Sequence, residues 1–141
     1  EDALEHGATL LTGGSVHKGL TFQPTILLEP SRDAKVWNDE TFGPVVTVVP
    51  ADNLEHALEL ANDTVFGLSA GILTHHTQRA FTLARKIKAG SVHVGMHSFQ
   101  SDALSPIGGY GMSGVGRSGG KYSVEAFTNQ KWLSVELGES P

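Results

Sequence analysis

Strand-like and helix-like segments alternate between residues 45 and 94, and this alternation constrains the fold more than any other feature. Strand-like runs occupy 45–49, 68–74 and 91–94, and helical patterns occupy 53–62 and 77–90. The β-branched run VVTVV (45–49) suits a strand buried on both faces. The short connections predict parallel strands joined by right-handed crossovers. The fold class is therefore α/β, with a βαβαβ unit and a parallel sheet.

The two helical patterns each have an apolar face. In the first, Leu54, Ala57, Leu58 and Ala61 follow the spacing of an amphipathic helix. In the second, the apolar face is made by Ala80, Phe81, Ala84 and Ile87.

Three further elements are predicted outside this unit. FQPTILLE (22–29) is a strand candidate that begins near Pro24, because proline cannot donate a ladder hydrogen bond. YSVEAF (122–127) predicts a short helix. KWLSVEL (131–137) alternates polar and apolar residues, as in a strand with one apolar face. Such a strand needs a partner edge, in this chain or in another.

Length and charge limit the classes of function. A chain of 141 residues predicts one compact domain with a core large enough to be stable alone. The net charge of −5, without a block of Lys or Arg, argues against nucleic acid or an anionic membrane as partner. No apolar run is long enough to cross a bilayer and no signal-peptide pattern begins the chain, so we expect a soluble, cytoplasmic protein.

The chain contains no cysteine. This excludes disulfides, cysteine-ligated metal centres and catalysis by a thiolate of this chain. His93 and His97 have the spacing of zinc ligands on a helix, but the first is on a predicted strand and the second in a loop. Without a third ligand, we expect no metal site.

The segment GGYGMSGVGRSGG (108–120) contains the spacing G-x-G-x-x-G twice. A dinucleotide-binding turn requires a strand before these glycines and a long helix after them. Pro106 makes the preceding segment loop-like, and residues 120–141 are too few for the rest of such a domain. We interpret the glycines as a structural turn, which disfavours a self-contained nucleotide-binding domain. Arg117 is interpreted as tying loop carbonyls together through its five donors.

Five segments, in family order, resemble the NAD(P)-dependent aldehyde dehydrogenases. SPIGGYGMSGVGRSGG is similar to the family's C-terminal signature, and NDETFGPVVTV to its E-E-I-F-G-P-V motif. The other three are GLTFQPTIL (19–27), ALELANDTVFGLSAGILT (57–74) and RKIKAGSVHV (85–94). The resemblance covers residues 7 to about 137. It implies that residues 1–127 are the C-terminal part of the catalytic domain and that residues 128–141 are an oligomerisation strand and tail.

In this family the Rossmann domain, the catalytic cysteine and the general-base glutamate lie upstream of the matched segments. The resemblance therefore implies that this chain holds no catalytic residue and is inactive alone. The complete enzyme would oxidise an aldehyde to a carboxylic acid with NAD or NADP, through attack by a thiolate and transfer of a hydride. The alternative is a non-catalytic oligomerisation module or a degenerate paralogue.

Two residues match cofactor-binding positions of the family. Glu40 corresponds to the glutamate that binds both hydroxyls of the nicotinamide ribose, and an ionised carboxylate suits two vicinal donors. Phe42 corresponds to the aromatic residue that rests beside the nicotinamide. Asp39 replaces the first glutamate of the motif, which is a conservative change.

Residues 95–106 match the segment that closes one side of the family's aldehyde tunnel. Selectivity in such a loop comes from a few side chains on a rigid scaffold. The candidates are Met96, His97, Phe99 and Gln100. The sequence departs from the family pattern at three positions: Gly95 replaces the common Asn, Ile107 the usual Phe, and Gly111 the usual Lys.

His93, Gly111 and EAFTNQKW (125–132) resemble the benzaldehyde and vanillin branch, which implies an aromatic aldehyde as substrate. GRSGGKYSVEAF (116–127) is also similar to the succinate-semialdehyde branch, but residues 95–106 contain no Arg to bind a substrate carboxylate. The strand at 131–137 matches the family's oligomerisation strand. It implies a homodimer or homotetramer.

Overall fold

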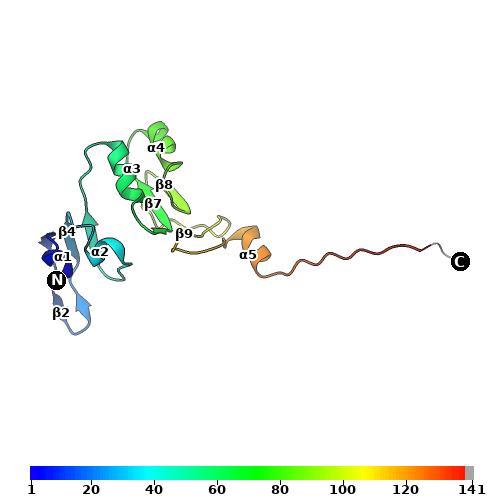
Figure 1. Ribbon diagram of the computed structural model, residues 1–141, viewed down its shortest axis with the longest axis horizontal. Coiled ribbons are helices and arrows are strands. Elements are labelled where there is room, and N and C mark those ends of the chain that lie inside the picture. Colours follow the sequence, from blue (N-terminus) through cyan, green and yellow to red (C-terminus); the bar gives the residue numbers. More distant parts are fainter. Residues whose placement is uncertain (139–141) are drawn as a thin grey trace. The chain divides into compact units, whose positions relative to one another are not determined.

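The computed structural model describes residues 1–138 (Figure 1). The chain forms two compact units, and the boundary between them in the sequence falls between Val65 and Phe66. The expectation of one compact domain with a large core is therefore wrong. In the described part, the buried apolar side chains are Ala3, Ala8, Leu27, Ala34 and Ala80. The physical reason is that most of the large apolar side chains remain at the surface, so neither unit closes around a large core.

The first unit is built on a three-stranded sheet in the order β1-β4-β5. β4 pairs antiparallel with β1 and parallel with β5, in register from Thr25–Val45 to Leu28–Val48. A separate hairpin pairs β2 with β3. The elements of this unit are α1 (Asp2–Glu5), β1 (Thr9–Thr12), β2 (Val16–Lys18), β3 (Thr21–Phe22), β4 (Thr25–Leu28), α2 (Lys35–Asn38), β5 (Val45–Val48) and α3 (Leu54–Asn62).

The predicted strand at 22–29 is confirmed as β4, which begins directly after Pro24. Its alternate residues Thr25 and Leu27 are buried, and Leu27 packs in the main apolar cluster with Ala3 and Ala8. β5 confirms the strand predicted at 45–49, but its burial on both faces was predicted wrongly. Val46 is 54% exposed, because β5 is the edge strand of this sheet and one face lacks a covering layer.

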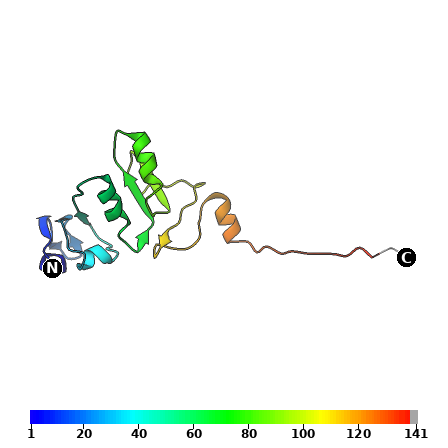
Figure 2. The same ribbon diagram turned by 45° about the horizontal axis from the view of Figure 1, so that its top comes forward.

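The second unit contains a parallel strand–helix–strand motif, β7–α4–β8, with α4 packed against β8 (Figures 1 and 2). β7 and β8 pair in register from Ser69–Ser91 to Ile72–Val94. A short antiparallel pair joins β6 to β9. The elements of this unit are β6 (Phe66–Gly67), β7 (Ser69–Ile72), α4 (Thr77–Ala84), β8 (Ser91–Val94), β9 (Tyr110–Gly111) and α5 (Gly120–Ala126).

The predicted βαβαβ unit is confirmed only in its second half. β5 pairs with β4, whereas β7 pairs with β8, so the three predicted strands belong to two sheets. Strands that follow each other in sequence are often neighbours in a sheet, but not always. Here the backbone hydrogen bonds of β5 are made with β4, the strand that precedes it in the sequence. The fold is mixed α/β with small sheets.

The helices agree with their patterns except in α4. α3 coincides with the predicted helix, and the Asn53 side chain caps it by accepting a hydrogen bond from the His56 backbone N–H at 2.9 Å. α4 ends at Ala84, which is earlier than predicted. Ala80 is 1% exposed while the neighbouring Phe81 is 64% exposed, so Phe81 is wrongly placed on the buried face. The buried side of α4 is the one that carries Ala80, and the helix packs against β8.

The chain after α5 differs from the prediction. α5 confirms the short helix expected at 122–127, but residues 129–138 contain neither helix nor strand, and Figure 1 draws them as a plain ribbon. Trp132 is 91% exposed. The strand predicted at 131–137 does not form, because no sheet edge among residues 1–138 supplies its backbone hydrogen bonds. The last three residues of the predicted tail, 139–141, lie outside the described residues. No helix within residues 1–138 has the length and apolar character required to cross a membrane.

The cap of α3 yields a stability prediction. Asn53→Ala removes the acceptor for the His56 amide and should lower the free energy of unfolding by about 1 kcal/mol. Asn53→Asp keeps an acceptor oxygen and should remain close to the wild type. Urea unfolding followed by helical circular dichroism measures both variants. Equal midpoints for the alanine and aspartate variants would show that the cap contributes nothing.

Candidate functional site

The two predicted cofactor-binding residues line one hollow of about 510 Å³ in the first unit. Glu40 and Phe42 lie on the segment that joins α2 to β5, and the sheet contributes the floor through Thr25, Leu27 and Val45. We call this cavity the first-unit hollow. Its lining is mainly apolar, and its charged side chains are mostly acidic: Glu1, Asp2, Asp39 and Glu40, beside the single basic side chain of Lys35.

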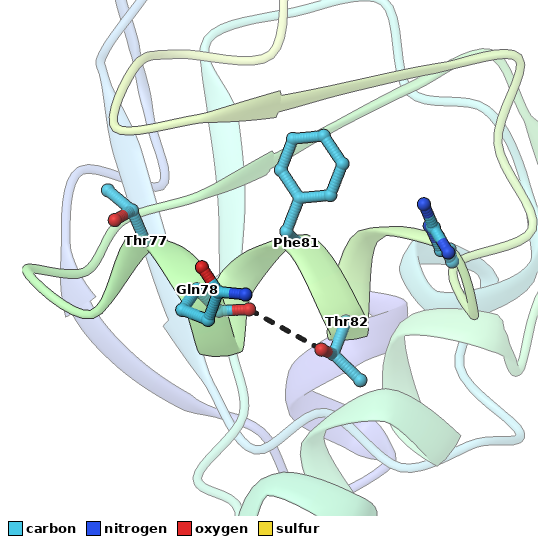
Figure 3. A pocket seen from close by; sticks show the side chains of 5 residues that line it. Thr77, Gln78, Phe81 and Thr82 are labelled. Atoms are coloured by element: carbon cyan, nitrogen blue, oxygen red, sulfur yellow. Dashed lines mark hydrogen bonds between the residues drawn. The ribbon is translucent and has the colours of Figure 1, made fainter.

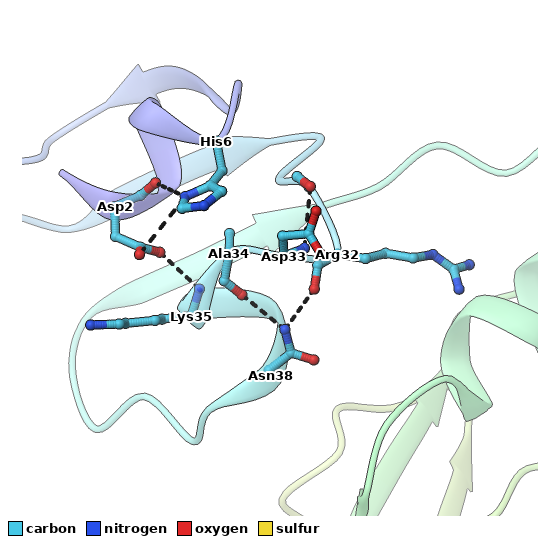
Figure 4. Close-up of polar contacts among 8 residues, drawn as sticks. Asp2, His6, Arg32, Asp33, Ala34, Lys35 and Asn38 are labelled. Atoms are coloured by element: carbon cyan, nitrogen blue, oxygen red, sulfur yellow. Dashed lines mark hydrogen bonds and ion pairs between the residues drawn. The ribbon is translucent and has the colours of Figure 1, made fainter.

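Side-chain hydrogen bonds hold α2, the one-turn helix that precedes Glu40 (Figure 4). The carboxylate of Asp2 in α1 accepts from the backbone N–H of Lys35 at 2.8 Å. The Asn38 amide donates to the carbonyl oxygens of Arg32 at 2.6 Å and Ala34 at 3.2 Å. An isolated single turn has too few internal hydrogen bonds to be stable, so these contacts fix where the segment carrying Glu40 begins.

Glu40 and Phe42 are both available to a ligand. Glu40 is exposed, and within residues 1–138 its carboxylate has no hydrogen-bond or ion-pair partner. Phe42 is 93% exposed. A free carboxylate can accept hydrogen bonds from two neighbouring hydroxyls, and an exposed ring can cover a flat apolar surface. This pair of groups fits the ribose and ring of a nicotinamide cofactor.

The four predicted substrate-binding residues lie in the second unit, on the loop that follows β8. We call residues 95–100 the 95–100 loop. Its four candidate side chains are exposed: Met96, His97, Phe99 and Gln100. The rings of His97 and Phe99 stack, with centroids 3.8 Å apart and an angle of 13° between their planes. The loop therefore presents a flat aromatic pair.

The departure from the family pattern at Gly95 has a conformational explanation. Gly95 has a φ of +76°, in the left-handed region. Glycine adopts this region without steric cost, and Asn is among the few other residues that enter it. Gly95 thus provides the reversal at the end of β8, and replacement of Asn by Gly preserves it.

The glycine-rich segment forms a turn that packs on itself. Ile107 and Ser118 exchange two backbone hydrogen bonds, each of 2.8 Å. A side chain at Gly119, which has a φ of +102°, would collide with the carbonyl oxygen of Ser105. The helix that follows, α5, is short. This arrangement is not a dinucleotide-binding turn.

Arg117 holds this turn together, which confirms its structural interpretation. Its Nη1 donates to the carbonyl oxygens of Gly109 at 3.2 Å and Gly116 at 2.6 Å. Its guanidinium lies 5.3 Å from the centre of the Tyr110 ring. The side chain is occupied by these contacts within the loop.

The histidines do not assemble a metal site in the described part of the chain, which contains no group of three His, Asp or Glu side chains placed to hold an ion. His93 lies on β8, and its Nε2 is buried without a hydrogen-bond partner. His97 is stacked on Phe99 in the loop.

A second groove, of about 480 Å³, runs along the exposed side of α4 (Figure 3). It is lined by Thr77, Gln78, Phe81, Thr82 and Arg85, and the Thr82 hydroxyl donates to the Gln78 carbonyl oxygen at 3.4 Å. It contains no carboxylate and none of the six predicted site residues.

Two residues of β7 that the sequence reasoning did not select contact the 95–100 loop. The Ser69 hydroxyl donates to the carbonyl oxygen of Ser98, and Gly71 lies directly beside the loop backbone. One signal was available for Gly71, because a glycine within a strand often marks a close approach of another backbone.

Comparisons with known proteins agree with the sequence motifs. A model of the aldehyde dehydrogenase family matches residues 1–133. The chain is 38% identical to a vanillin dehydrogenase of Pseudomonas fluorescens, over 98% of this chain and 28% of that protein. It is 35% identical to a benzaldehyde dehydrogenase of Bacillus subtilis, over 96% of this chain and 28% of that protein. The chain thus spans little more than a quarter of the length of these relatives.

Solved structures give the same result. A salicylaldehyde dehydrogenase from Pseudomonas putida G7, complexed with salicylaldehyde, matches 99% of this chain and 29% of that chain, with a TM-score of 0.89 and 34% identity. A Mycobacterium tuberculosis aldehyde dehydrogenase complexed with NAD+ matches 99% of this chain and 29% of that chain, with a TM-score of 0.86 and 33% identity.

The contacts of Arg117 predict the behaviour of the glycine-rich turn. Arg117→Ala removes two charge-assisted hydrogen bonds to loop carbonyls, so the amides of Ile107 and Ser118 should exchange with solvent about tenfold faster. Lys121→Ala is the control, because Lys121 also lies over an aromatic ring, Tyr122, but outside the turn. Hydrogen exchange measured by NMR checks both. Unchanged exchange in Arg117→Ala would contradict the structural role.

Proposed function

This chain belongs to the aldehyde dehydrogenase family, and we propose that it is the C-terminal part of the catalytic domain of an NAD(P)-dependent enzyme that oxidises an aldehyde to a carboxylic acid. Residues 1–127 would belong to the catalytic domain, and residues 128–141 to an oligomerisation strand and tail. The observation that carries the proposal is the family match over residues 1–133, within which Glu40 and Phe42 line one hollow.

In this proposal the first-unit hollow contacts the nicotinamide end of the cofactor. The cofactor, when bound, would supply the hydride acceptor. Glu40 would accept hydrogen bonds from both ribose hydroxyls, and Phe42 would rest beside the ring. The free carboxylate and the exposed ring support this assignment, since neither is engaged by another residue of the described chain.

The nucleophile is not supplied by this chain. Oxidation through a thiohemiacetal requires a thiolate, and the 141 residues contain no cysteine. We therefore expect the general base and the nucleophile to come from a segment outside these residues. By itself the chain should therefore turn over no aldehyde.

The proposed substrate is an aromatic aldehyde, selected in part by the 95–100 loop. The names of the relatives support this class, since they include vanillin, salicylaldehyde and benzaldehyde dehydrogenases. The stacked rings of His97 and Phe99 also support it, because a flat apolar face suits an aromatic substrate.

The proposed assembly is a homodimer or homotetramer. Residues 131–137 would add as a strand to the sheet edge of a second copy, which would supply the backbone partners that this chain lacks. The exposure of Trp132, Leu133, Val135 and Leu137 supports this role. A non-catalytic oligomerisation module would use the same strand but would have no aldehyde activity in the complete protein.

The role of Glu40 is tested by Glu40→Gln in the complete protein. Loss of the charge weakens two hydrogen bonds to the ribose, so the KM for the nicotinamide cofactor should rise about tenfold. Glu59→Gln on α3 removes an exposed carboxylate from the same unit and is the control. Steady-state kinetics with varied cofactor measures both. An unchanged KM in Glu40→Gln would remove this residue from the cofactor site.

The substrate class and the incompleteness of the chain are tested together. The complete protein should reduce NAD or NADP with benzaldehyde as substrate and do so more efficiently than with acetaldehyde. The isolated chain of 141 residues should produce no reduced cofactor and show no micromolar binding of NAD by calorimetry. Turnover by the isolated chain would contradict the proposal. Absence of turnover in the complete protein would favour the non-catalytic module.

A further inference from the structure

The 95–100 loop runs back along β7 in the opposite direction to the strand. At one end the Gly95 amide donates to the Ile72 carbonyl oxygen at 2.8 Å. In the middle the loop backbone passes over Gly71. At the other end the Ser69 hydroxyl donates to the Ser98 carbonyl oxygen. The contacts therefore follow the order 72, 71, 69 along the strand as the loop advances from 95 to 98.

Ser69 and Gly71 share one face of β7, because alternate residues of a strand point to the same side. Ala70 and Ile72 point to the other side and are half-buried. The loop thus lies against the outer face of the strand, where Ser69 is the only side chain and Gly71 has none.

Gly71 permits the closest part of this approach. A methyl group at this position would lie 3.0 Å from the Met96 carbonyl oxygen and 3.3 Å from the Ser98 amide nitrogen. Both atoms are backbone, so they move only if the whole loop moves. A larger side chain at position 71 would lift the loop from the strand.

Ser69 supplies the side-chain hydrogen bond between β7 and the loop. Its acceptor is the carbonyl oxygen of Ser98. In the sequence Ser98 lies between His97 and Phe99, the two residues whose rings stack. The bond therefore fixes the part of the backbone that determines where these two rings lie. His93, on β8 opposite Gly71, does not replace this anchor, since its Nε2 has no partner.

We propose that Ser69 and Gly71 are positioning residues for aldehyde selectivity: they hold the 95–100 loop against β7 and thereby place the His97–Phe99 pair. Neither residue is proposed to touch the substrate. The inference rests on the proposed function of the loop in aldehyde binding. Because selectivity depends on small displacements of the groups that orient a substrate, loss of either anchor should change it.

Four variants of the complete protein test the proposal. Ser69→Ala removes the hydroxyl donor, and Ser69→Thr restores it. Gly71→Val adds bulk beneath the loop while favouring the strand itself, since valine suits β-structure. Thr82→Ala is the matched control, because it also removes a hydroxyl that donates to a backbone carbonyl of the second unit.

Two readouts separate this inference from the proposed function. The first is hydrogen exchange of the Gly95 amide, which donates to the Ile72 carbonyl oxygen where the loop begins. This exchange should be about tenfold faster in Ser69→Ala and Gly71→Val, and unchanged in Ser69→Thr and Thr82→Ala. The second is the ratio of kcat/KM for benzaldehyde to that for acetaldehyde, which should fall about tenfold in the same two variants.

Faster exchange together with a lower ratio, reversed by Ser69→Thr, supports the proposal. Unchanged exchange overturns it, whether or not the protein is active. Faster exchange with an unchanged ratio in an active enzyme also overturns it. If the wild type oxidises no aldehyde, the proposed function fails, and the role in selectivity fails with it, whereas the exchange data still report whether Ser69 and Gly71 anchor the loop.

Discussion

The pairing of β4 with strands on both sides is the interaction on which the first unit depends. β4 satisfies its backbone antiparallel on β1 and parallel on β5, and it places Leu27 in the apolar cluster. The hydroxyl of Thr25 links β4 to the segments that precede it. It donates to the Gln23 carbonyl oxygen and accepts from the Gly14 amide, each at 2.8 Å. The Thr25 amide in turn donates to the Pro44 carbonyl oxygen at 2.7 Å. One end of the segment carrying Glu40 and Phe42 is thereby attached to the central strand.

The other end of that segment depends on polar contacts together with Val36 of α2, which packs against the apolar cluster. α2 is held by Asp2 and Asn38, and Arg32 joins the loop before α2 to the end of α3 through an ion pair with Asp63 at 2.6 Å. Such an exposed ion pair contributes little by itself. The proposed cofactor-binding segment is therefore attached to the sheet by a backbone hydrogen bond at one end, and held by polar contacts and Val36 at the other.

The sequence predicted local structure well because local structure depends on local patterns. The start of β4 follows from Pro24, α3 from its apolar spacing and the Asn53 cap, and the role of Arg117 from its donor geometry. Glu40 and Phe42 were identified through a resemblance and lie together in one hollow, although their binding role stays a prediction. The same holds for the loop residues from Met96 to Gln100.

The errors concern the partners of each element, which no local pattern specifies. The apolar run of β5 does not indicate that it pairs with β4 and leaves Val46 exposed. Periodicity also does not decide which side of α4 packs on β8, so Phe81 was misplaced. The strand at 131–137 has the correct alternation, but alternation supplies no hydrogen-bonding partner. Ser69 was missed because no local sequence pattern indicates that its hydroxyl donates to the carbonyl oxygen of Ser98, which is 29 residues away in the sequence.

The residues that hold the 95–100 loop against β7 differ from the residues whose side chains the loop exposes. The contacts with β7 described above use backbone groups, the Ser69 hydroxyl and the missing side chain of Gly71, and none of them uses a side chain of the loop. Those side chains are consequently free to differ among proteins with this frame. Under the proposed function, new aldehyde preferences can then be reached by substitutions at positions 96, 97, 99 and 100 without redesign of the strand beneath them.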